Sequence, residues 1–218
     1  MLRFQVRSPL LAFARRVFLA AALLALAAPA LAARTVMVFG DSLSAAYGLA
    51  SEDGWVNLLA RRIAGEGLPW KVVNASVSGE TTAGGLARLP AELARHRPSI
   101  VVIELGANDA LRGQPIAQMR ANLERMIRLV RKAGAQPVLV GLMIPPNYGI
   151  DYAAEFRDAY AAVAGREKVP LVPFLLAGIV EHRDLFQADQ LHPTAAAQPR
   201  ILDNVWTTLA PLLAKARS

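Results

Sequence analysis

The sequence contains no cysteine, and its aromatic and charged residues are few, at 6% and 19% of 218 residues. Without cysteine the chain cannot form a disulfide, a thiolate zinc site, a cysteine nucleophile or the lipid anchor of a lipoprotein. Glycine and proline are ordinary in number, at 15 and 14, whereas hydrophobic residues make up 54%. This composition excludes a disordered or fibrous protein and indicates one globular domain with a sizeable core.

Positive charge is concentrated at the N-terminus. The formal net charge is +7, and the first 16 residues contain four arginines and no acidic residue. An apolar stretch follows over residues 17–28, and an Ala-x-Ala pattern ends at Ala32. A basic head, a short apolar run and small residues at the end are typical of a secretory signal peptide. We therefore predict a signal peptide over residues 1–32, cleavage near Ala32, a periplasmic or secreted location, and a mature domain over residues 33–218.

An uncleaved membrane anchor is the alternative interpretation of this segment. The apolar run is shorter than the roughly 20 residues that a bilayer requires, and Pro29 interrupts it. No stable membrane insertion is therefore expected after cleavage. The charge of the remaining chain is scattered, without a basic block, so nucleic-acid binding is not expected either.

Short apolar runs rich in β-branched residues alternate with longer segments of helical periodicity. The runs that predict strands are 35–39, 71–74, 99–104, 137–141 and 170–174. The segments that predict helices lie near 55–64, 85–96, 115–133, 152–167 and 194–214. The strands are continuously apolar, which is expected when helices cover both faces of a sheet. The predicted fold class is α/β, with a five-stranded parallel sheet in a three-layer α/β/α sandwich.

Polar clusters follow the predicted strands or precede the last helix. They are Gly40-Asp41-Ser42-Leu43, Asn74 with Ser78-Gly79-Glu80-Thr81-Thr82, Gly106-Ala107-Asn108-Asp109, and Asp189-Gln190-Leu191-His192-Pro193. Ligands of open parallel sheets bind beyond the carboxyl ends of the strands. Four polar clusters at one edge of one sheet therefore predict a functional site there.

Ser42 is the candidate nucleophile of this site. It is predicted to lie in a tight strand-to-helix turn, with Gly40 permitting an unusual backbone geometry. A serine hydroxyl is a weak nucleophile until a base takes its proton. His192 can be that base, because Asp189 lies three residues earlier and can bind one ring nitrogen while the other faces Ser42. The residues predict a Ser-His-Asp triad in the chain order Ser42, Asp189, His192.

The other two histidines are weaker candidates for the base. His96 is predicted to lie at the surface near the end of a helix, and His182 lies in a charged stretch that is expected to be solvated. An oxyanion also needs hydrogen-bond donors in place before the reaction. The candidate donors are the N–H groups of Ser42 and Gly79 and the side-chain amide of Asn108.

Two loops at the same edge are expected to shape an apolar substrate site. They follow the third and fourth predicted strands and supply the candidate contacts Leu111, Met143, Ile144 and Tyr148. Met143 and Ile144 are equally well interpreted as core residues at the end of a strand. Arg112 in the first loop is expected to face water rather than an anionic group of the substrate.

Four motifs carry a family resemblance. They are Gly40-Asp41-Ser42-Leu43-Ser44, Gly79, Gly106-x-Asn108-Asp109 and Asp189-x-x-His192-Pro193. In this order they resemble the motifs of the SGNH (GDSL) hydrolase family, in particular its bacterial periplasmic acyl-CoA thioesterase I, lysophospholipase and arylesterase branch. Two positions depart from the pattern: Ala107 replaces an expected glycine, and Gln190-Leu191 stands where Gly-Ile is common.

The resemblance implies a flavodoxin-like sheet and an enzyme without metal or cofactor. It also implies that Ser42, Asp189 and His192 form the triad, and that Gly79 and Asn108 complete the oxyanion hole with Ser42. The expected reaction is hydrolysis of acyl esters and thioesters, such as acyl-CoA, lysophospholipids and aryl or p-nitrophenyl esters. A monomer is expected.

Several alternatives are open on the sequence alone. Asp41 is interpreted as structural, and Leu43 stands where an aspartyl phosphatase would have a second acid. The chain has no G-x-S-x-G nucleophile elbow, and Ser78 is the reserve nucleophile. A carbohydrate acetyl esterase on the same scaffold is the alternative enzyme. A non-catalytic periplasmic binding module is the alternative outside catalysis.

Overall fold

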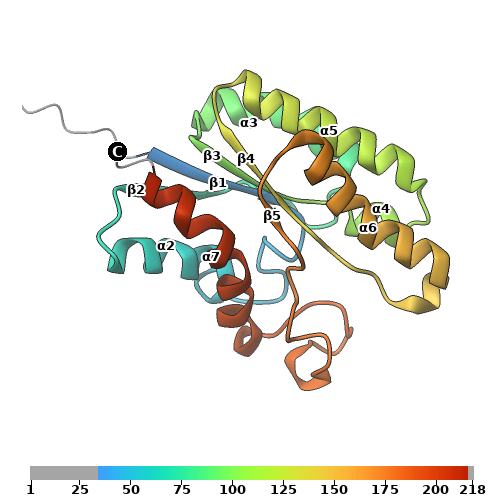
Figure 1. The fold of residues 1–218 in the computed structure, drawn as a ribbon. Helices are drawn as coiled ribbons and strands as arrows, with labels where there is room; N and C mark the ends of the chain where they lie inside the picture. Colours follow the sequence, from blue (N-terminus) through green and yellow to red (C-terminus); the bar gives the residue numbers. More distant parts are fainter. Residues whose placement is uncertain (1–33, 216–218) are drawn as a thin grey trace, which may run out of the picture. The chain divides into compact units, whose positions relative to one another are not determined.

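The computed structural model describes residues 34–215, which form a five-stranded sheet with helices on both faces (Figure 1). The strands are β1 (Arg34–Gly40), β2 (Trp70–Asn74), β3 (Ile100–Glu104), β4 (Gln136–Val140) and β5 (Leu171–Val172). Every neighbouring pair is parallel, in the order β2-β1-β3-β4-β5. This is the strand order of flavodoxin-like folds, whose ligand crevice lies between the first and third strands. The predicted α/β fold class is confirmed.

The long helices divide between the two faces of the sheet. Helices α2 (Trp55–Gly65) and α7 (Gln198–Lys215) pack together on one face. Helices α3 (Thr82–His96), α5 (Ile116–Lys132) and α6 (Ile150–Glu167) pack side by side on the other (Figure 1). Each helix buries one apolar stripe, as α5 does with residues at helical spacing. These residues of α5 are Ile116, Met119, Leu123, Met126, Ile127 and Val130.

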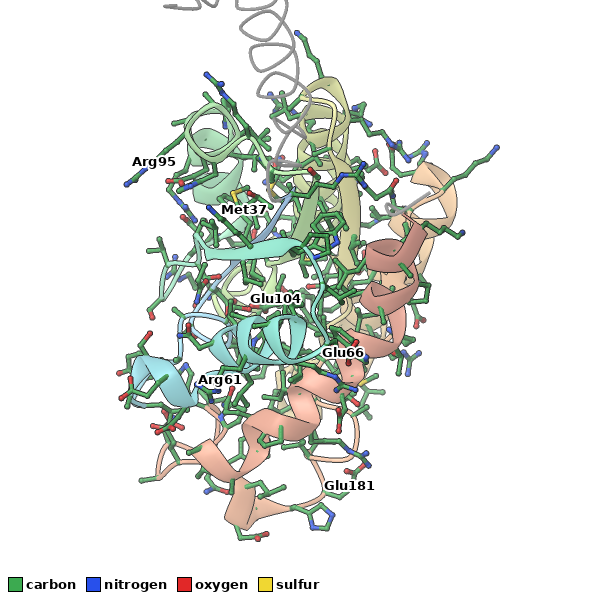
Figure 2. The ribbon with its side chains drawn as sticks, turned by 90° about the vertical axis from the view of Figure 1, so that its left-hand side faces the viewer. Met37, Arg61, Glu66, Arg95, Glu104 and Glu181 are labelled. Carbon is green, nitrogen blue, oxygen red and sulfur yellow. The ribbon has the colours of Figure 1, made fainter. Side chains whose placement is uncertain are left out.

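The core lies between the sheet and its helices. Met37 of β1 and every residue of β3 are buried, whereas charged residues such as Arg61 and Arg95 are exposed on the outer faces (Figure 2). Glu104, the last residue of β3, is a carboxyl group with no exposed surface. The sheet therefore buries an acidic group at the edge where the functional site was predicted.

The observed elements differ from the predicted ones mainly at their ends. Helix α3 begins at Thr82, earlier than predicted, because the Thr81 side chain accepts a hydrogen bond from the N–H of Gly84 at 3.2 Å. A short helix, α4 (Ala107–Leu111), replaces what looks in sequence like a strand-end turn. Helix α7 begins at Gln198 rather than near residue 194, since residues 195–197 form a 3-10 turn.

The segment with Ser42 connects a strand to a helix as predicted, but it is longer than the tight turn expected, and Gly40 has a different part in it. Residues 41–48 form a run of turns, and the first α-helix does not begin until Trp55. Gly40 does not have a positive φ, unlike Gly79 at +78°. Gly40 instead allows close packing, because a Cβ there would lie 2.5 Å from Glu104 Oε2 and 2.8 Å from Ser44 Oγ.

The predicted signal peptide over residues 1–32 lies outside the described residues. Strand β1 begins at Arg34, so cleavage after Ala32 would leave the whole sheet intact. Within residues 34–215, no helix combines the length and the hydropathy needed to cross a bilayer.

Candidate active site

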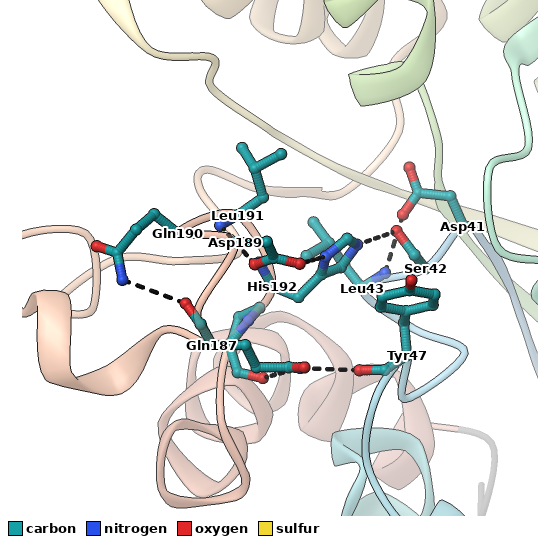
Figure 3. Close-up of polar contacts among 10 residues, drawn as sticks. Asp41, Ser42, Leu43, Tyr47, Gln187, Asp189, Gln190, Leu191 and His192 are labelled. Carbon is teal, nitrogen blue, oxygen red and sulfur yellow. Dashed lines mark hydrogen bonds and ion pairs between the residues drawn. The ribbon is translucent and has the colours of Figure 1, made fainter.

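Ser42, His192 and Asp189 form a continuous hydrogen-bonded relay (Figure 3). The Nε2 atom of His192 lies 2.9 Å from the Oγ atom of Ser42, and its Nδ1 atom lies 2.7 Å from Oδ2 of Asp189. Ser42 and His192 are 150 residues apart in the chain. The two meet because both follow strands that end at the same edge of the parallel sheet. The structure thus brings together all three predicted triad residues.

Asp189 is held by the loop in which it lies. Its Oδ1 atom accepts hydrogen bonds from the backbone N–H groups of Leu191 and His192, both at 3.0 Å. These bonds, with that from the imidazole of His192, lower the pKa of Asp189 to about 2. The carboxylate is therefore ionised at neutral pH and fixes the imidazole with the Nδ1 proton toward itself, leaving Nε2 to accept a proton.

The turn after β1 presents Ser42 to the imidazole. Asp41 is buried, and its Oδ1 atom accepts a hydrogen bond from the N–H of Leu43 at 3.0 Å. The Ser42 carbonyl in turn accepts from the N–H of Tyr47 at 3.2 Å. The turn is thus pinned on both sides of the serine, while Ser42 itself stays partly exposed.

The three predicted oxyanion donors lie on the wall of one cavity with the serine. That cavity measures about 320 Å³, and Ser42, Gly79 and Asn108 all line it. Among the described residues, none accepts from the backbone N–H of Ser42 or of Gly79. Asn108 donates one amide hydrogen to Oδ2 of Asp41 at 3.1 Å, which leaves its second amide hydrogen for another acceptor.

Two buried carboxyl groups lie behind the serine turn. Glu104 Oε2 accepts from Ser44 Oγ at 2.6 Å and from the Asp41 N–H at 3.4 Å. Burial raises the pKa of Glu104 well above its usual range, and the nearby charge of Asp41 adds to this. Burial also raises the pKa of Asp41, to about 6. Burial therefore favours the uncharged form of both carboxyl groups.

The apolar side of the cavity contains three of the four predicted substrate contacts. Leu111, Met143 and Ile144 line it, whereas Tyr148 does not. Met143 is exposed, which fits the interpretation as a substrate contact, whereas Ile144 is buried, which fits the interpretation as a core residue at the end of a strand. A second groove of about 480 Å³ adjoins the first and shares its apolar wall. The shared residues are Met143, Ile144, Pro145, Leu176 and Leu191.

The remaining candidates lie apart from the relay or beside it. His96 pairs with Glu92 near the end of α3 at 3.1 Å, and His182 is exposed. Ser78 lines the cavity, but the imidazole binds Ser42. Arg112 is exposed as predicted, and it also donates a hydrogen bond to the carbonyl of Gly79 at 3.0 Å. Within residues 34–215, no three metal-ligating side chains gather in one place.

Three residues of the site were missed in the sequence. The ring of Tyr47 lies 4.4 Å from the imidazole of His192, centre to centre, and the Gln187 side chain contacts both loops of the relay. Neither residue has a signal in a single sequence. Glu104 does have one, because it is the only charged residue of the apolar run 99–104. A charge at the end of a buried strand indicates a buried polar site.

Comparisons with known proteins agree with this geometry. A family model described as the GDSL-like lipase/acylhydrolase family matches residues 38–199. Esterase TesA of Pseudomonas aeruginosa is 55% identical over 182 residues, which cover 84% of this chain and 90% of that protein. Thioesterase 1/protease 1/lysophospholipase L1 of Escherichia coli K12 is 39% identical over 188 residues, covering 84% of this chain and 87% of the relative.

A solved structure gives the same likeness in three dimensions. The psychrotrophic esterase EstA from Pseudoalteromonas sp., in a structure inhibited by monoethylphosphonate, superposes with a TM-score of 0.79 at 40% sequence identity. The match covers 83% of this chain and 99% of that one. The likeness therefore extends over nearly the whole of that esterase.

Proposed function

The chain belongs to the GDSL-like lipase/acylhydrolase family, and from that premise we propose that it hydrolyses acyl esters and thioesters through an acyl-enzyme on Ser42. The observation that carries the proposal is the relay from Asp189 through His192 to Ser42. A hydroxyl bound to a basic ring nitrogen, with the ring oriented by a carboxylate, is the arrangement that activates serine for attack on a carbonyl.

Acylation follows from the positions of these groups. Ser42 Oγ attacks the acyl carbonyl carbon while His192 Nε2 takes the hydroxyl proton. The carbonyl oxygen becomes an anion, which the N–H groups of Ser42 and Gly79 and the amide of Asn108 can bind. The tetrahedral intermediate then collapses, the bond to the leaving alcohol or thiol breaks, and His192 gives its proton to that group.

Deacylation reverses the roles of the same residues. His192 takes a proton from a water molecule as its oxygen attacks the acyl carbon, and the oxyanion forms again in the same place. The bond to Ser42 Oγ then breaks, the serine recovers its proton from His192, and the carboxylic acid leaves. The negative charge of Asp189 stabilises the imidazolium that forms in each half of the cycle.

The apolar cavity wall supports an acyl substrate. Leu111, Met143 and Ile144 are proposed to contact the acyl chain, since they line the cavity that contains the serine. The names of the relatives, an esterase and a thioesterase/lysophospholipase, support the ester and thioester classes. Because these relatives are named as enzymes, they also favour catalysis over a binding module.

The proposal is tested by replacing the serine. Ser42→Ala is expected to abolish hydrolysis of short p-nitrophenyl esters and to abolish covalent labelling by a fluorophosphonate. Ser78→Ala is the matched control for the label, because Ser78 lies on the same cavity wall. A Ser42→Ala protein that keeps wild-type hydrolysis would disprove the assignment, and loss of the label in Ser78→Ala alone would move the nucleophile to Ser78.

A chain-length profile tests the substrate class. Esters from acetyl to palmitoyl, an acyl-CoA and a lysophospholipid are compared by kcat/KM. Activity that extends to longer acyl chains and to the thioester is expected. Activity confined to acetyl groups would favour the carbohydrate acetyl esterase instead.

Export as a monomer is proposed for the same enzyme. The support is the basic and apolar pattern of residues 1–32 and the start of β1 at Arg34, just beyond the proposed cleavage point. The N-terminal sequence of the protein recovered from the periplasm or medium is expected to begin at Ala33. Its mass in solution is expected to be that of one chain.

A further inference from the structure

We propose that Gln187 is a positioning residue that fastens the loop carrying His192 to the loop carrying Ser42, and so holds the imidazole within reach of the serine hydroxyl. The histidine loop is defined here as residues 185–194 and the serine loop as residues 41–49. The inference rests on the proposed function, because it concerns how the same hydroxyl and imidazole are kept together.

Within the histidine loop, Gln187 has a fixed relation to His192. The backbone N–H of Gln187 donates to the carbonyl of His192 at 2.8 Å, and the N–H of Thr194 donates to the carbonyl of Leu185 at 2.8 Å. An antiparallel bridge between Phe186 and Pro193 closes the loop between these two bonds. Movement of Gln187 therefore moves the backbone that carries the imidazole.

The side-chain amide of Gln187 reaches across to the serine loop (Figure 3). Its Nε2 atom donates to the carbonyl of Tyr47 at 2.9 Å and to the carbonyl of Pro193 at 3.1 Å. A glutamine amide has two hydrogens on one nitrogen. Here each hydrogen can bind a different loop, so one planar group sets the spacing between Tyr47 and Pro193, the residue after His192.

The carbonyl that Gln187 binds is coupled directly to the nucleophile. The N–H of Tyr47 donates to the carbonyl of Ser42 at 3.2 Å, so a short chain of hydrogen bonds runs from Gln187 through Tyr47 to Ser42. The ring of Tyr47 also packs against the imidazole of His192, at an interplanar angle of 38°. Tyr47 thus contacts the backbone of Ser42 and the imidazole of His192, and Gln187 binds the carbonyl of Tyr47.

The serine loop is shaped to receive this amide. Ala46 and Gly48, on either side of Tyr47, have φ values of 58° and 73°. A Cβ at residue 48 would lie 2.2 Å from Gln187 Oε1. Alanine is tolerated at a similar φ at position 46, so the requirement for glycine at position 48 comes from the close approach of Gln187 as well as from the backbone.

A clamp is needed because the other side-chain hydrogen bond between the loops is the reacting one. Among the described residues, two side-chain hydrogen bonds join the loops: Gln187 to Tyr47, and His192 to Ser42. The second bond breaks and forms again in every turnover, since its proton is transferred. Only the first can hold the spacing throughout the cycle. A misplacement of about 1 Å in reacting groups can lower a rate about 10²-fold.

Gln187→Met tests the clamp. Methionine keeps the length and approximate volume of the side chain and removes both donors. We expect kcat for a short p-nitrophenyl ester, and the rate constant of fluorophosphonate labelling of Ser42, to fall at least 10-fold with KM changed less than 2-fold. Both rates are divided by the number of active sites that have reacted with the fluorophosphonate at completion. Unfolded protein therefore does not contribute to either rate.

Gln190→Met is the matched control. Gln190 lies in the same loop, and among the described residues its side-chain amide binds the Gln187 carbonyl alone, at 3.2 Å, without reaching the serine loop. It is expected to keep kcat within 2-fold. A Gln187→Met protein with kcat within 2-fold of wild type overturns the proposal, and so does an equal loss in both variants. A lower melting temperature with unchanged normalised rates would show a merely structural role and overturns it too.

Gly48→Ala tests the same contact from the other loop and serves if Gln187→Met does not fold. Its Cβ would displace the Gln187 amide, so a loss of at least 5-fold in normalised kcat is expected. In the double variant the two losses are expected not to multiply, because both remove one interaction. Fully multiplicative losses, or a Gly48→Ala protein with wild-type kcat, overturn the clamp. Absence of the label from Ser42 in the unmodified protein would instead disprove the proposed function.

Discussion

The side-chain nitrogen of Asn108 donates a hydrogen bond to Oδ2 of Asp41 across 3.1 Å. The two residues are 67 positions apart and follow β3 and β1, which are neighbours in the sheet. An ionised carboxyl group only accepts hydrogen bonds, so this contact decides which end of the Asn108 amide is the nitrogen. Asp41 thereby orients a candidate oxyanion donor as well as holding the turn at Leu43.

Asn108→Ala is expected to lower kcat by about 10²–10³-fold, equivalent to roughly 2.7–4 kcal/mol of lost transition-state stabilisation. KM for a small ester should change little, because the amide binds the developing anion rather than the neutral carbonyl. Steady-state kinetics with p-nitrophenyl esters measure both parameters. Asn57→Ala is the control, since Asn57 lies on α2 and donates to Ser51 instead. A loss below 5-fold in Asn108→Ala would remove Asn108 from the oxyanion hole.

Asp189→Asn is expected to lower kcat by about 10³–10⁴-fold, because the imidazole loses the carboxylate that fixes its tautomer and stabilises its positive charge. The fold should survive, since an asparagine oxygen can still accept from the N–H groups of Leu191 and His192. Circular dichroism melts check the fold, and single-turnover labelling checks the chemistry. If kcat remained within 10-fold of wild type, Asp189 would be a loop residue rather than part of the relay.

The sequence predicted those parts of the molecule that depend on regular structure. Apolar strands alternating with helices specify a parallel sheet, and such a sheet gathers the residues after its strands at one edge, which is why Ser42, Gly79 and Asn108 could be placed together. His192 and Asp189 could be added because a short loop constrains two residues three positions apart. Each of these inferences needs only spacing and strand direction.

The parts that could not be predicted depend on the shape of irregular loops. The bond from Gln187 to Tyr47 joins a side chain to a carbonyl 140 positions away, and nothing in either loop's composition specifies it. The turns after Ser42, which are longer than the tight turn predicted there, are a related case. The positive φ of Ala46 and Gly48 continues the turns where a helix would otherwise begin. Loop geometry of this kind follows from tertiary packing rather than from local preference.

Asp41→Asn is expected to lower kcat although Asp41 does not contact the reacting atoms. An asparagine at position 41 can keep its oxygen toward the N–H of Leu43, but its own nitrogen then faces the nitrogen of Asn108. The Asn108 amide must turn over to avoid two facing donors, and its oxygen and nitrogen exchange places. We expect a loss of about 10–10²-fold in kcat, smaller than or equal to that of Asn108→Ala. The double variant should lose no more than Asn108→Ala alone.

The same substitution is expected to make the protein's stability less dependent on pH. Burial raises the pKa of Asp41 to about 6, above the value of 3.8 for an unperturbed aspartate. A raised pKa in the folded state contributes stability that is fully present below pH 3.8 and is lost as the pH rises through 6. At roughly 1.4 kcal/mol for each unit of pKa shift, the loss from this group is on the order of 3 kcal/mol by pH 8.

Asp41→Asn cannot ionise, so its free energy of unfolding relative to wild type should increase between pH 5 and pH 8. Urea denaturation at both pH values measures that difference. Glu104, whose pKa is raised in the same direction, is present in both proteins, and the loss of the Asp41 charge lowers its pKa toward the usual range. Any change at Glu104 therefore also favours the variant at high pH. A difference in stability that is constant with pH would show that Asp41 is ionised in the fold without strain, and that its burial imposes no penalty.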